Sequence, residues 1–473
     1  MRIRWILWSY VILSTGHVLS KGLAFLSAVA IGRALGPHQT GLFGTATTFL
    51  LFAWVIADCG VGTIGGRLVA SNPALTRNLD RNVFLIRLAG AALAVSLGSL
   101  AVVFFGGPSS ILLPLCLSAI VYAFRRDWLL LGLGRIPAVA GAAVLRDLTF
   151  LLLSIGIVSS TKSLEAAVWS FFGAELVWSL VTTWAVRGAN SQSVATSQTR
   201  SLGLYSQGWP VALMAMMTLT YNKIDTPLIA WLRGPAEAGV YWAAYTIVFG
   251  VLGFSAVLSR AAFPEMARTS APGQPRDMSQ TMRLSMIGAG AGALASILVS
   301  TWAPQLIRLA YGPKYAAGAG ALSILAWCLW PNFSAALLLQ RLVVDGRQRI
   351  LAGGALIAAA LNVGLNVLII PRLGMLGAAG TSVASETCLL MLAIFAYRKS
   401  LWVGRFLAAQ VWLGVAMTAA IWVGGRVGFH GDFAKGILIL AIFVLLSAPI
   451  ATGILRQFDS LRPQGTPETP ASL

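Results

Sequence analysis

Apolar residues form long runs along almost the whole chain, separated by short polar connections. A run of about 20 apolar residues can cross the hydrocarbon core of a bilayer as a helix, and counting such runs predicts about fourteen spans. They lie near residues 8–34, 40–64, 84–105, 110–132, 138–158, 165–186, 204–231, 238–258, 284–307, 317–339, 350–370, 375–397, 406–425 and 434–455. The pattern predicts an all-α polytopic membrane protein.

The composition agrees with this pattern, because 57% of the residues are hydrophobic and only 10% are charged. A soluble domain carries about 25% charged residues. The first residues, MRIRWILWSYVILSTGHVLSKG, have the basic start and apolar core of a signal peptide. They lack a small-residue cleavage site and the run continues to Leu35, so we interpret them as an uncleaved first helix.

The net charge of +19 would suggest a nucleic-acid partner in a soluble protein. Here most of the 34 Lys and Arg residues fall on one side of the predicted spans, the side that holds both termini. Because cytoplasmic loops are enriched in Lys and Arg, both termini are predicted to be cytoplasmic, with no nucleic acid bound. The run Arg125-Arg126-Asp127 is interpreted as a positive-inside stop at the end of a span.

A short motif occurs twice. Residues 31–46 read IGRALGPHQTGLFGTA, and residues 229–244 read IAWLRGPAEAGVYWAA. Both stretches contain Gly-Pro, then three residues, then Gly followed by an aliphatic and an aromatic residue. The two copies are offset by 198 residues throughout. An even number of predicted spans separates the copies, which predicts two parallel six-helix repeats around a central cavity. The domains then comprise an N-terminal half (1–200), a C-terminal half (201–400), two extra transmembrane helices (401–457) and a disordered cytoplasmic tail (458–473).

Several charged residues lie inside predicted spans, where each costs about 2.5–3.5 kcal/mol unless it faces a cavity or a partner. Shifting Lys21 by the repeat offset places it one helical turn from Lys223, so the two lysines share a face of equivalent helices. We predict that both face the central cavity and bind an anion there. Arg146 and Arg33 are further candidates for substrate binding. Neutralisation by Asp147 or another helix is the alternative for Arg146, and a structural anchor at the rim is the alternative for Arg33.

Three acidic residues, Asp225, Asp58 and Glu175, are candidates for coupling transport to a proton or sodium gradient. Charge balance for the basic residues is the alternative role for each of them. Lys223 and Asp225 are two residues apart and point about 200° apart on a helix, so they cannot pair well with each other. Both roles remain open for Asp225.

No sequence signal indicates an enzyme. The chain has no Walker loop, and its three histidines and four cysteines show no metal-ligand spacing. We therefore predict no catalytic residue, no bound metal and no cofactor.

Four stretches resemble the polysaccharide exporter and oligosaccharide flippase branch of the multidrug/oligosaccharidyl-lipid/polysaccharide (MOP) flippase superfamily. They are SKGLAFLSAVAIGRALGPHQTGLFGTA (20–46), IDTPLIAWLRGPAEAGVYWAA (224–244), YGPKYAAGAGALSIL (311–325) and LNVGLNVLIIPRLGMLGAAGTSVASE (361–386).

The resemblance implies a flippase of the bacterial inner membrane that works by alternating access of its two halves. Its substrate would be an oligosaccharide linked to a polyprenyl pyrophosphate of the undecaprenyl class, for O-antigen, capsule or exopolysaccharide biosynthesis. Membrane lipids and polysaccharide polymerase machinery are the further partners implied. In the similar lipid II flippases, extra helices help to form a groove for the lipid tail.

Two alternative functions were weighed. A multidrug or cation antiporter of the same superfamily would need an acidic or aromatic cavity, which the basic residues inside the spans disfavour. A membrane polysaccharide polymerase usually carries a large outer loop, whereas every predicted outer loop here is short. The glycan, the coupling ion and the oligomeric state are not indicated by the sequence.

Overall fold

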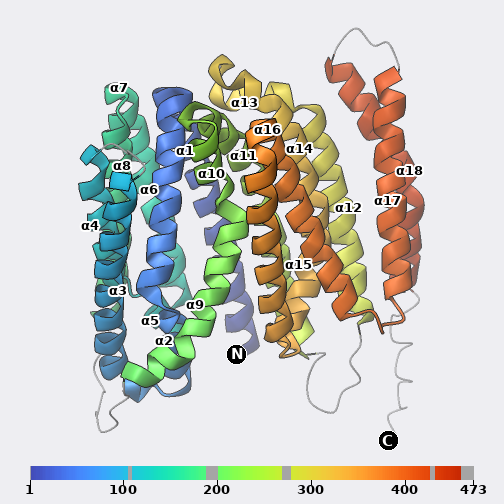
Figure 1. The fold of residues 1–473 in the computed structure, drawn as a ribbon. Coiled ribbons are helices and arrows are strands. Elements are labelled where there is room, and N and C mark those ends of the chain that lie inside the picture. The colour runs from blue at the N-terminus through green and yellow to red at the C-terminus, as the bar shows by residue number, and fades with distance from the viewer. Residues whose placement is uncertain (1, 105–108, 188–200, 269–277, 427–431, 460–473) are drawn as a thin grey trace, which may run out of the picture.

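The computed structural model describes residues 2–104, 109–187, 201–268, 278–426 and 432–459, and the regular structure in these ranges is helical throughout (Figure 1). The elements are α1 (Arg2–Asp58), α2 (Val61–Ser71), η1 (Pro73–Leu75), α3 (Thr76–Phe104), η2 (Ser109–Ile111), α4 (Leu112–Ala123), α5 (Asp127–Gly132), α6 (Ile136–Leu153), η3 (Ser154–Val158), α7 (Ser159–Thr161), α8 (Leu164–Arg187), α9 (Ser201–Lys223), α10 (Asp225–Leu232), α11 (Pro235–Arg268), α12 (Ser279–Thr301), α13 (Ala303–Tyr311), η4 (Pro313–Gly318), α14 (Ala319–Leu325), η5 (Ala326–Cys328), α15 (Leu329–Val344), α16 (Gln348–Ala396), α17 (Val403–Arg426) and α18 (Asp432–Asp459).

Ten helical segments in the described ranges are long and apolar enough to cross a membrane, so the chain is a multi-pass membrane protein of the all-α class, as predicted. Two of these segments, 15–58 and 348–396, have 44 and 49 residues, about twice the length that one crossing needs. Each contains a glycine with positive φ, Gly36 (74°) and Gly374 (55°), which interrupts the helix. The kinks fall where the sequence predicts one span to end and the next to begin, while the count of fourteen stays a prediction.

The helices stand side by side in one elongated bundle (Figure 1). Helices α3, α4, α6 and α8 lie at one end of it, and α12, α15 and α16 lie toward the other. Helices α17 and α18 pack against each other and against α12 at the far edge. Helix α1 begins on the same face of the bundle on which α18 ends, in agreement with the prediction of two termini on one side. Residues 460–473 of the predicted tail lie outside the described ranges.

The two copies of the repeated motif touch each other. A Cβ atom added to Gly41 on α1 would overlap the carbonyl oxygen of Pro235, and one added to Gly239 on α11 would overlap the carbonyl oxygen of Pro37. The repeat offset relates Gly41 to Gly239 and Pro37 to Pro235, so each glycine receives the proline carbonyl of the opposite copy. Such a reciprocal contact is expected where a two-fold axis relates the repeats.

A second close contact joins the halves near the face on which α1 begins (Figure 1). Gly60, before α2, adopts a φ of 75°. A Cβ atom on Gly60 would overlap the carbonyl oxygen of Gly208 on α9, and a Cβ atom on Gly208 would crowd the carbonyl oxygen of Cys59. Glycine at these positions therefore lets the backbones of α2 and α9 approach each other closely.

Candidate substrate site

The two lysines predicted to act together meet at one aromatic ring. The Nζ of Lys223, the last residue of α9, lies 4.0 Å from the ring centroid of Phe249 on α11 and 4.6 Å from that of Tyr245. The Nζ of Lys21, on α1, lies 5.3 Å from the same Phe249 ring. An ammonium group is attracted to the electron-rich face of an aromatic ring. The aromatic ring thus holds one cation from each predicted half of the chain.

The charge of Lys223 is not balanced by an acidic side chain. In the part of the chain that the structure describes, no carboxylate forms an ion pair with it. Lys223 and Lys21 are both half-buried. Two cations that share one ring in a partly buried place are a favourable arrangement for binding an anion between them.

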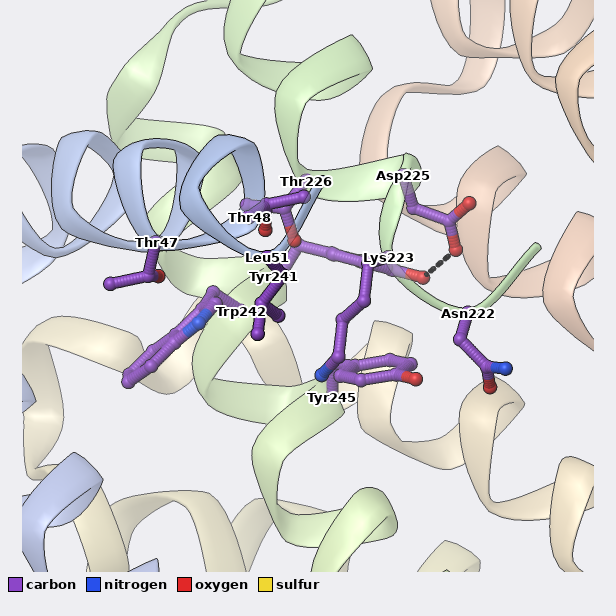
Figure 2. A pocket seen from close by; sticks show the side chains of 10 residues that line it. All are labelled: Thr47, Thr48, Leu51, Asn222, Lys223, Asp225, Thr226, Tyr241, Trp242 and Tyr245. Carbon is purple, nitrogen blue, oxygen red and sulfur yellow. Dashed lines mark hydrogen bonds between the residues drawn. The ribbon is translucent and has the colours of Figure 1, made fainter. Parts of the chain in front are cut away.

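Lys223 lines a small pocket between the halves (Figure 2). The pocket has a volume of about 50 Å³, and its wall includes Thr47 and Thr48 from α1 and Tyr245 from α11. Figure 2 shows the Lys223 side chain directed toward the Tyr245 ring. This space is too small for a pyrophosphate and its sugars, because drug-sized ligands need about 300–1,000 Å³. The site is therefore closed, in keeping with the two glycine contacts that hold the halves together.

A larger pocket of about 300 Å³ lies between α1 and α11, on the Lys21 side of the site. His17, Lys21 and Phe25 line it from α1, and Ile247 and Phe254 line it from α11. Apart from His17 and Lys21 the lining carries no ionisable side chain, and Phe254 is 55% exposed on the outer surface. An apolar pocket with a cation at its wall can hold a hydrocarbon chain that ends in an anionic group.

Asp225 lies in the C-terminal half, two residues from Lys223 but turned away from it (Figure 2). Helix α9 ends at Lys223 and α10 begins at Asp225, so the helix is interrupted between these two residues. One Asp225 oxygen accepts hydrogen bonds from Tyr241 Oη and Ser382 Oγ, both at 2.6 Å, and the other accepts one from Asn366 Nδ2 at 2.7 Å. Asp225 is 2% exposed, and no Lys or Arg of the described chain forms an ion pair with it.

The N-terminal half buries a network of paired charges. Arg146 on α6 forms ion pairs with Asp147 and, at 2.7 Å, with Glu175 on α8. Asp147 also accepts a hydrogen bond from Ser20, the neighbour of Lys21 on α1. Arg125 lies 3.5 Å from Glu175. These contacts neutralise Arg146, in line with the alternative role that the sequence leaves open for it. They also link α1 to α6 and α8.

Other predicted residues also have structural partners. Asp58 forms a 2.6 Å ion pair with Arg87, which is 3% exposed. Arg33 donates hydrogen bonds to the carbonyl oxygens of Leu309 and, at 2.7 Å, Ala310, near the end of α13. These contacts are typical of charge balance for Asp58 and of an anchor for Arg33. A role of either residue in transport stays a prediction, as it does for Glu175 and Arg146.

Several side chains of the site were not predicted. Tyr241, Tyr245 and Phe249 follow each other at intervals of four residues on α11, with neighbouring ring centroids 6.2 and 5.7 Å apart. Asn362 and Asn366 show the same spacing in an apolar run, and Asn362 accepts a 2.9 Å hydrogen bond from Asn366. Each of these spacings places the residues on one face of a helix, a signal that was present in the sequence.

Arg125 was missed as part of a buried cluster, and Glu386, one of the charged residues inside the predicted spans, was given no role. Arg125, interpreted from the sequence as a positive-inside stop, is 8% exposed, and its guanidinium carbon lies 3.8 Å from the ring centroid of Trp178. Glu386 on α16 accepts a 3.1 Å hydrogen bond from Asn332, whose amide oxygen accepts one from Ser255 at 2.7 Å. The C-terminal half thus buries two carboxylates, Asp225 and Glu386, among neutral partners.

A multi-pass helical bundle with a pocket between two joined halves is an architecture typical of membrane transporters. The profile of the family described as "Polysaccharide biosynthesis protein" matches residues 6–270, more than half of the chain. The chain belongs to this family, and the predicted relationship to the polysaccharide flippases of the MOP superfamily is confirmed.

Curated and solved relatives agree with this assignment. The chain is 20% identical over 373 residues to the probable low-salt glycan biosynthesis flippase Agl15 of Haloferax volcanii, covering 77% of each protein. Its fold is similar to that of the lipid II flippase MurJ in an inward closed conformation, with a TM-score of 0.74, 13% identity and 95% and 100% of the two chains covered. An inward-facing multidrug resistance MATE transporter of the MOP superfamily gives a TM-score of 0.58 at 14% identity, with 82% and 95% covered.

Proposed function

We propose that the protein moves a polyprenyl-pyrophosphate-linked oligosaccharide across the membrane and binds the pyrophosphate between Lys21 and Lys223. The observation that carries this proposal is the meeting of the two lysines at the Phe249 ring. A pyrophosphate has several oxygens, so it can accept hydrogen bonds from both ammonium groups and offset their mutual repulsion. A cationic drug would be repelled at the same place, which disfavours a multidrug antiporter.

The pocket between α1 and α11 supports a path for the lipid. Lys21 borders this pocket, and the Phe249 ring that it contacts lies within 4.0 Å of Lys223 Nζ. In the proposed path the polyprenyl chain stays in the bilayer and reaches the apolar pocket from the side. The pyrophosphate then passes from Lys21 to the space between both lysines, and the sugars follow it into the cavity.

Alternating access is the proposed transport cycle. Substrate cannot occupy the closed pocket, so the halves must separate, either at the contact of α2 with α9 or at that of α1 with α11. Separation of one contact while the other stays closed would open the site to one membrane face at a time. The Gly41–Gly239 contact would then be the gate on the side opposite the termini.

Asp225 is the proposed coupling residue, with a proton or Na⁺ as its ligand. A buried carboxylate with only neutral partners can gain a proton or bind a cation without breaking an ion pair. Asp225 is also two residues from Lys223, at the break between α9 and α10. A change in its charge can therefore alter the position of the substrate-binding lysine.

The setting of this activity is also proposed. A bacterial inner membrane, cytoplasmic termini and an undecaprenyl-class carrier fit the arginine distribution and the cationic site. A polysaccharide polymerase is the proposed recipient of the flipped product.

The decisive experiment measures polysaccharide export in cells that carry Lys21→Ala together with Lys223→Ala. Export is expected to be lost while the amount of protein in the membrane is unchanged, because both cations at the Phe249 ring are gone. The exposed Arg77→Ala is the control, since it removes a cation that does not contact this ring. Near-normal export in the double variant would refute the pyrophosphate site.

A binding measurement separates the ligand from the transport cycle. Purified protein is titrated with undecaprenyl pyrophosphate and with undecaprenol, which carries no phosphate. Wild-type protein is expected to prefer the pyrophosphate, and the double variant is expected to lose the preference but to keep the binding of undecaprenol. An equal preference in both proteins would place the pyrophosphate elsewhere.

A further inference from the structure

A second polar pocket lies far from the lysine site, on the face of the bundle where α16 ends and α17 begins (Figure 1). Its volume is about 710 Å³, and it is enclosed by the turn between α15 and α16 and the turn between α16 and α17. The lining includes Asp345 and Arg347 from the first turn and Arg398, Lys399, Leu401 and Trp402 from the second. The pocket therefore bridges the C-terminal half and the two extra helices.

The pocket carries positive charge without an acidic partner. Asp345, the one carboxylate among the described residues that line the pocket, forms a 3.1 Å ion pair with the fully buried Arg341 and accepts a 3.1 Å hydrogen bond from Tyr397. Among the residues with described positions, no carboxylate forms an ion pair with Arg347, Arg398 or Lys399. Three cations thus border one concavity.

The arginines are held in place but keep free donors. Arg347 Nη1 donates a 2.9 Å hydrogen bond to the carbonyl oxygen of Ala396, and its guanidinium carbon lies 5.4 Å from the ring centroid of Tyr397. The guanidinium carbon of Arg398 lies 4.0 Å from the ring centroid of Phe395. A guanidinium group has five N–H donors, so each arginine can still bind the oxygens of a phosphate.

Apolar side chains project beside these cations. Leu401 is 96% exposed, in a turn that joins two membrane helices. The adjacent Trp402 ring has the guanidinium carbons of Arg283 and Arg405 each 4.8 Å from its centroid. Tryptophan next to cationic side chains is typical of the level of the lipid headgroups, where acyl chains begin.

We propose that this pocket binds an anionic membrane phospholipid, with its phosphate at Arg347, Arg398 and Lys399 and its acyl chains beside Leu401 and Trp402. Basic pockets between membrane helices at the cytoplasmic surface suit anionic headgroups. The exposed leucine favours a lipid over a free phosphate or nucleotide, because a soluble ligand gains nothing from it. The bound lipid would join the two turns and so connect α17 and α18 to the transporter.

The experiment measures lipid retention by the purified full-length protein with native mass spectrometry, using phosphatidylglycerol and phosphatidylcholine as probes. The variant is Arg347→Gln with Arg398→Gln and Lys399→Gln. Its retention of phosphatidylglycerol is expected to fall at least roughly tenfold, because all three cations that would bind the phosphate are removed. Retention of phosphatidylcholine is expected to be weak and unchanged.

The matched control is Arg67→Gln with Arg77→Gln and Arg81→Gln, three exposed arginines that the sequence assigns to the same membrane face. It removes the same charge without touching the pocket, so its phosphatidylglycerol retention is expected to stay near that of the wild type. Equal losses in both variants would show that only the general surface charge matters and would overturn the site.

Two further measurements complete the test. Inorganic phosphate at millimolar concentration is added, and full displacement of the lipid by it would identify a phosphate site and refute the lipid assignment. If the triple variant is not folded, the double variant Arg398→Gln with Lys399→Gln keeps the Arg347 contacts and is measured instead. Wild-type retention in that variant would contradict the proposal.

Discussion

Two buried clusters, one around Arg146 in the N-terminal half and one around Asp225 in the C-terminal half, hold their polar side chains in opposite ways. The N-terminal half pairs charge with charge, as Arg146 does with Glu175 and Asp147. The C-terminal half surrounds Asp225 with the hydroxyl and amide groups of Tyr241, Ser382 and Asn366. A paired charge is committed to its partner, whereas a carboxylate among neutral donors can change its charge state and keep its neighbours. The comparison therefore favours packing for the first cluster and supports the proposed exchange of an ion at the second.

The strongest test of this comparison is Arg146→Met, which leaves Glu175 and Asp147 without their nearest cation. Removing one partner of a buried ion pair costs about 3–5 kcal/mol. We expect a marked fall in the thermal unfolding temperature of the purified protein and a smaller amount in the membrane. The exposed Arg77→Met serves as control and should unfold like the wild type. Wild-type stability together with lost transport would instead give Arg146 a direct role in substrate binding.

An intermediate effect is expected at the contact of the two repeats. Gly41→Ala and Gly239→Ala each insert a methyl group against a proline carbonyl of the other half, and such overpacking costs about 1–3 kcal/mol. Because the contact is reciprocal, the two variants should lose similar stability and transport in export and melting assays.

Gly141→Ala and Gly290→Ala are the controls for this pair, since open space surrounds a Cβ atom at both positions. Both should behave like the wild type or melt slightly higher, as alanine favours helix. A large difference between Gly41→Ala and Gly239→Ala would show that the halves do not share the contact equally.

The smallest effect on stability is expected for Asp225→Asn, although its effect on transport should be large. The amide has nearly the same shape, and its oxygen can keep the hydrogen bonds from Tyr241 and Ser382. Its NH2 group cannot accept the one from Asn366, so the free energy of unfolding should fall by about 1 kcal/mol. Export should be lost, because the amide cannot bind a proton or Na⁺ in the way a carboxylate does.

Asp58→Asn is the matching change in the N-terminal half, and it should affect stability more than transport. It breaks the ion pair with the buried Arg87 and should lower the melting temperature clearly. Normal export by Asp225→Asn would reject Asp225 as the coupling residue, and Glu386→Gln would then test the other carboxylate that has neutral partners.

The sequence predicted the membrane class, the boundaries between spans near Gly36 and Gly374 and the proximity of Lys21 and Lys223, because periodic runs and a repeat offset carry that information. It did not predict the shared Phe249 ring, since contacts across halves depend on how α1 and α11 pack. Arg125 was assigned to a loop because a hydropathy count places any charge at the end of a span outside the membrane. Its burial depends on Glu175, which is distant in the sequence.

The contact between Gly41 and Gly239 has the geometry of an isologous dimer interface, in which one patch meets a copy of itself. In a half-length ancestor that assembled as a dimer, one glycine would have served both sides, and one mutation would have altered both. Joining the halves in a single chain separates these two positions. Each side of the contact can then change alone, so the paired charges around Arg146 and the neutral surroundings of Asp225 can arise without disturbing the axis between them.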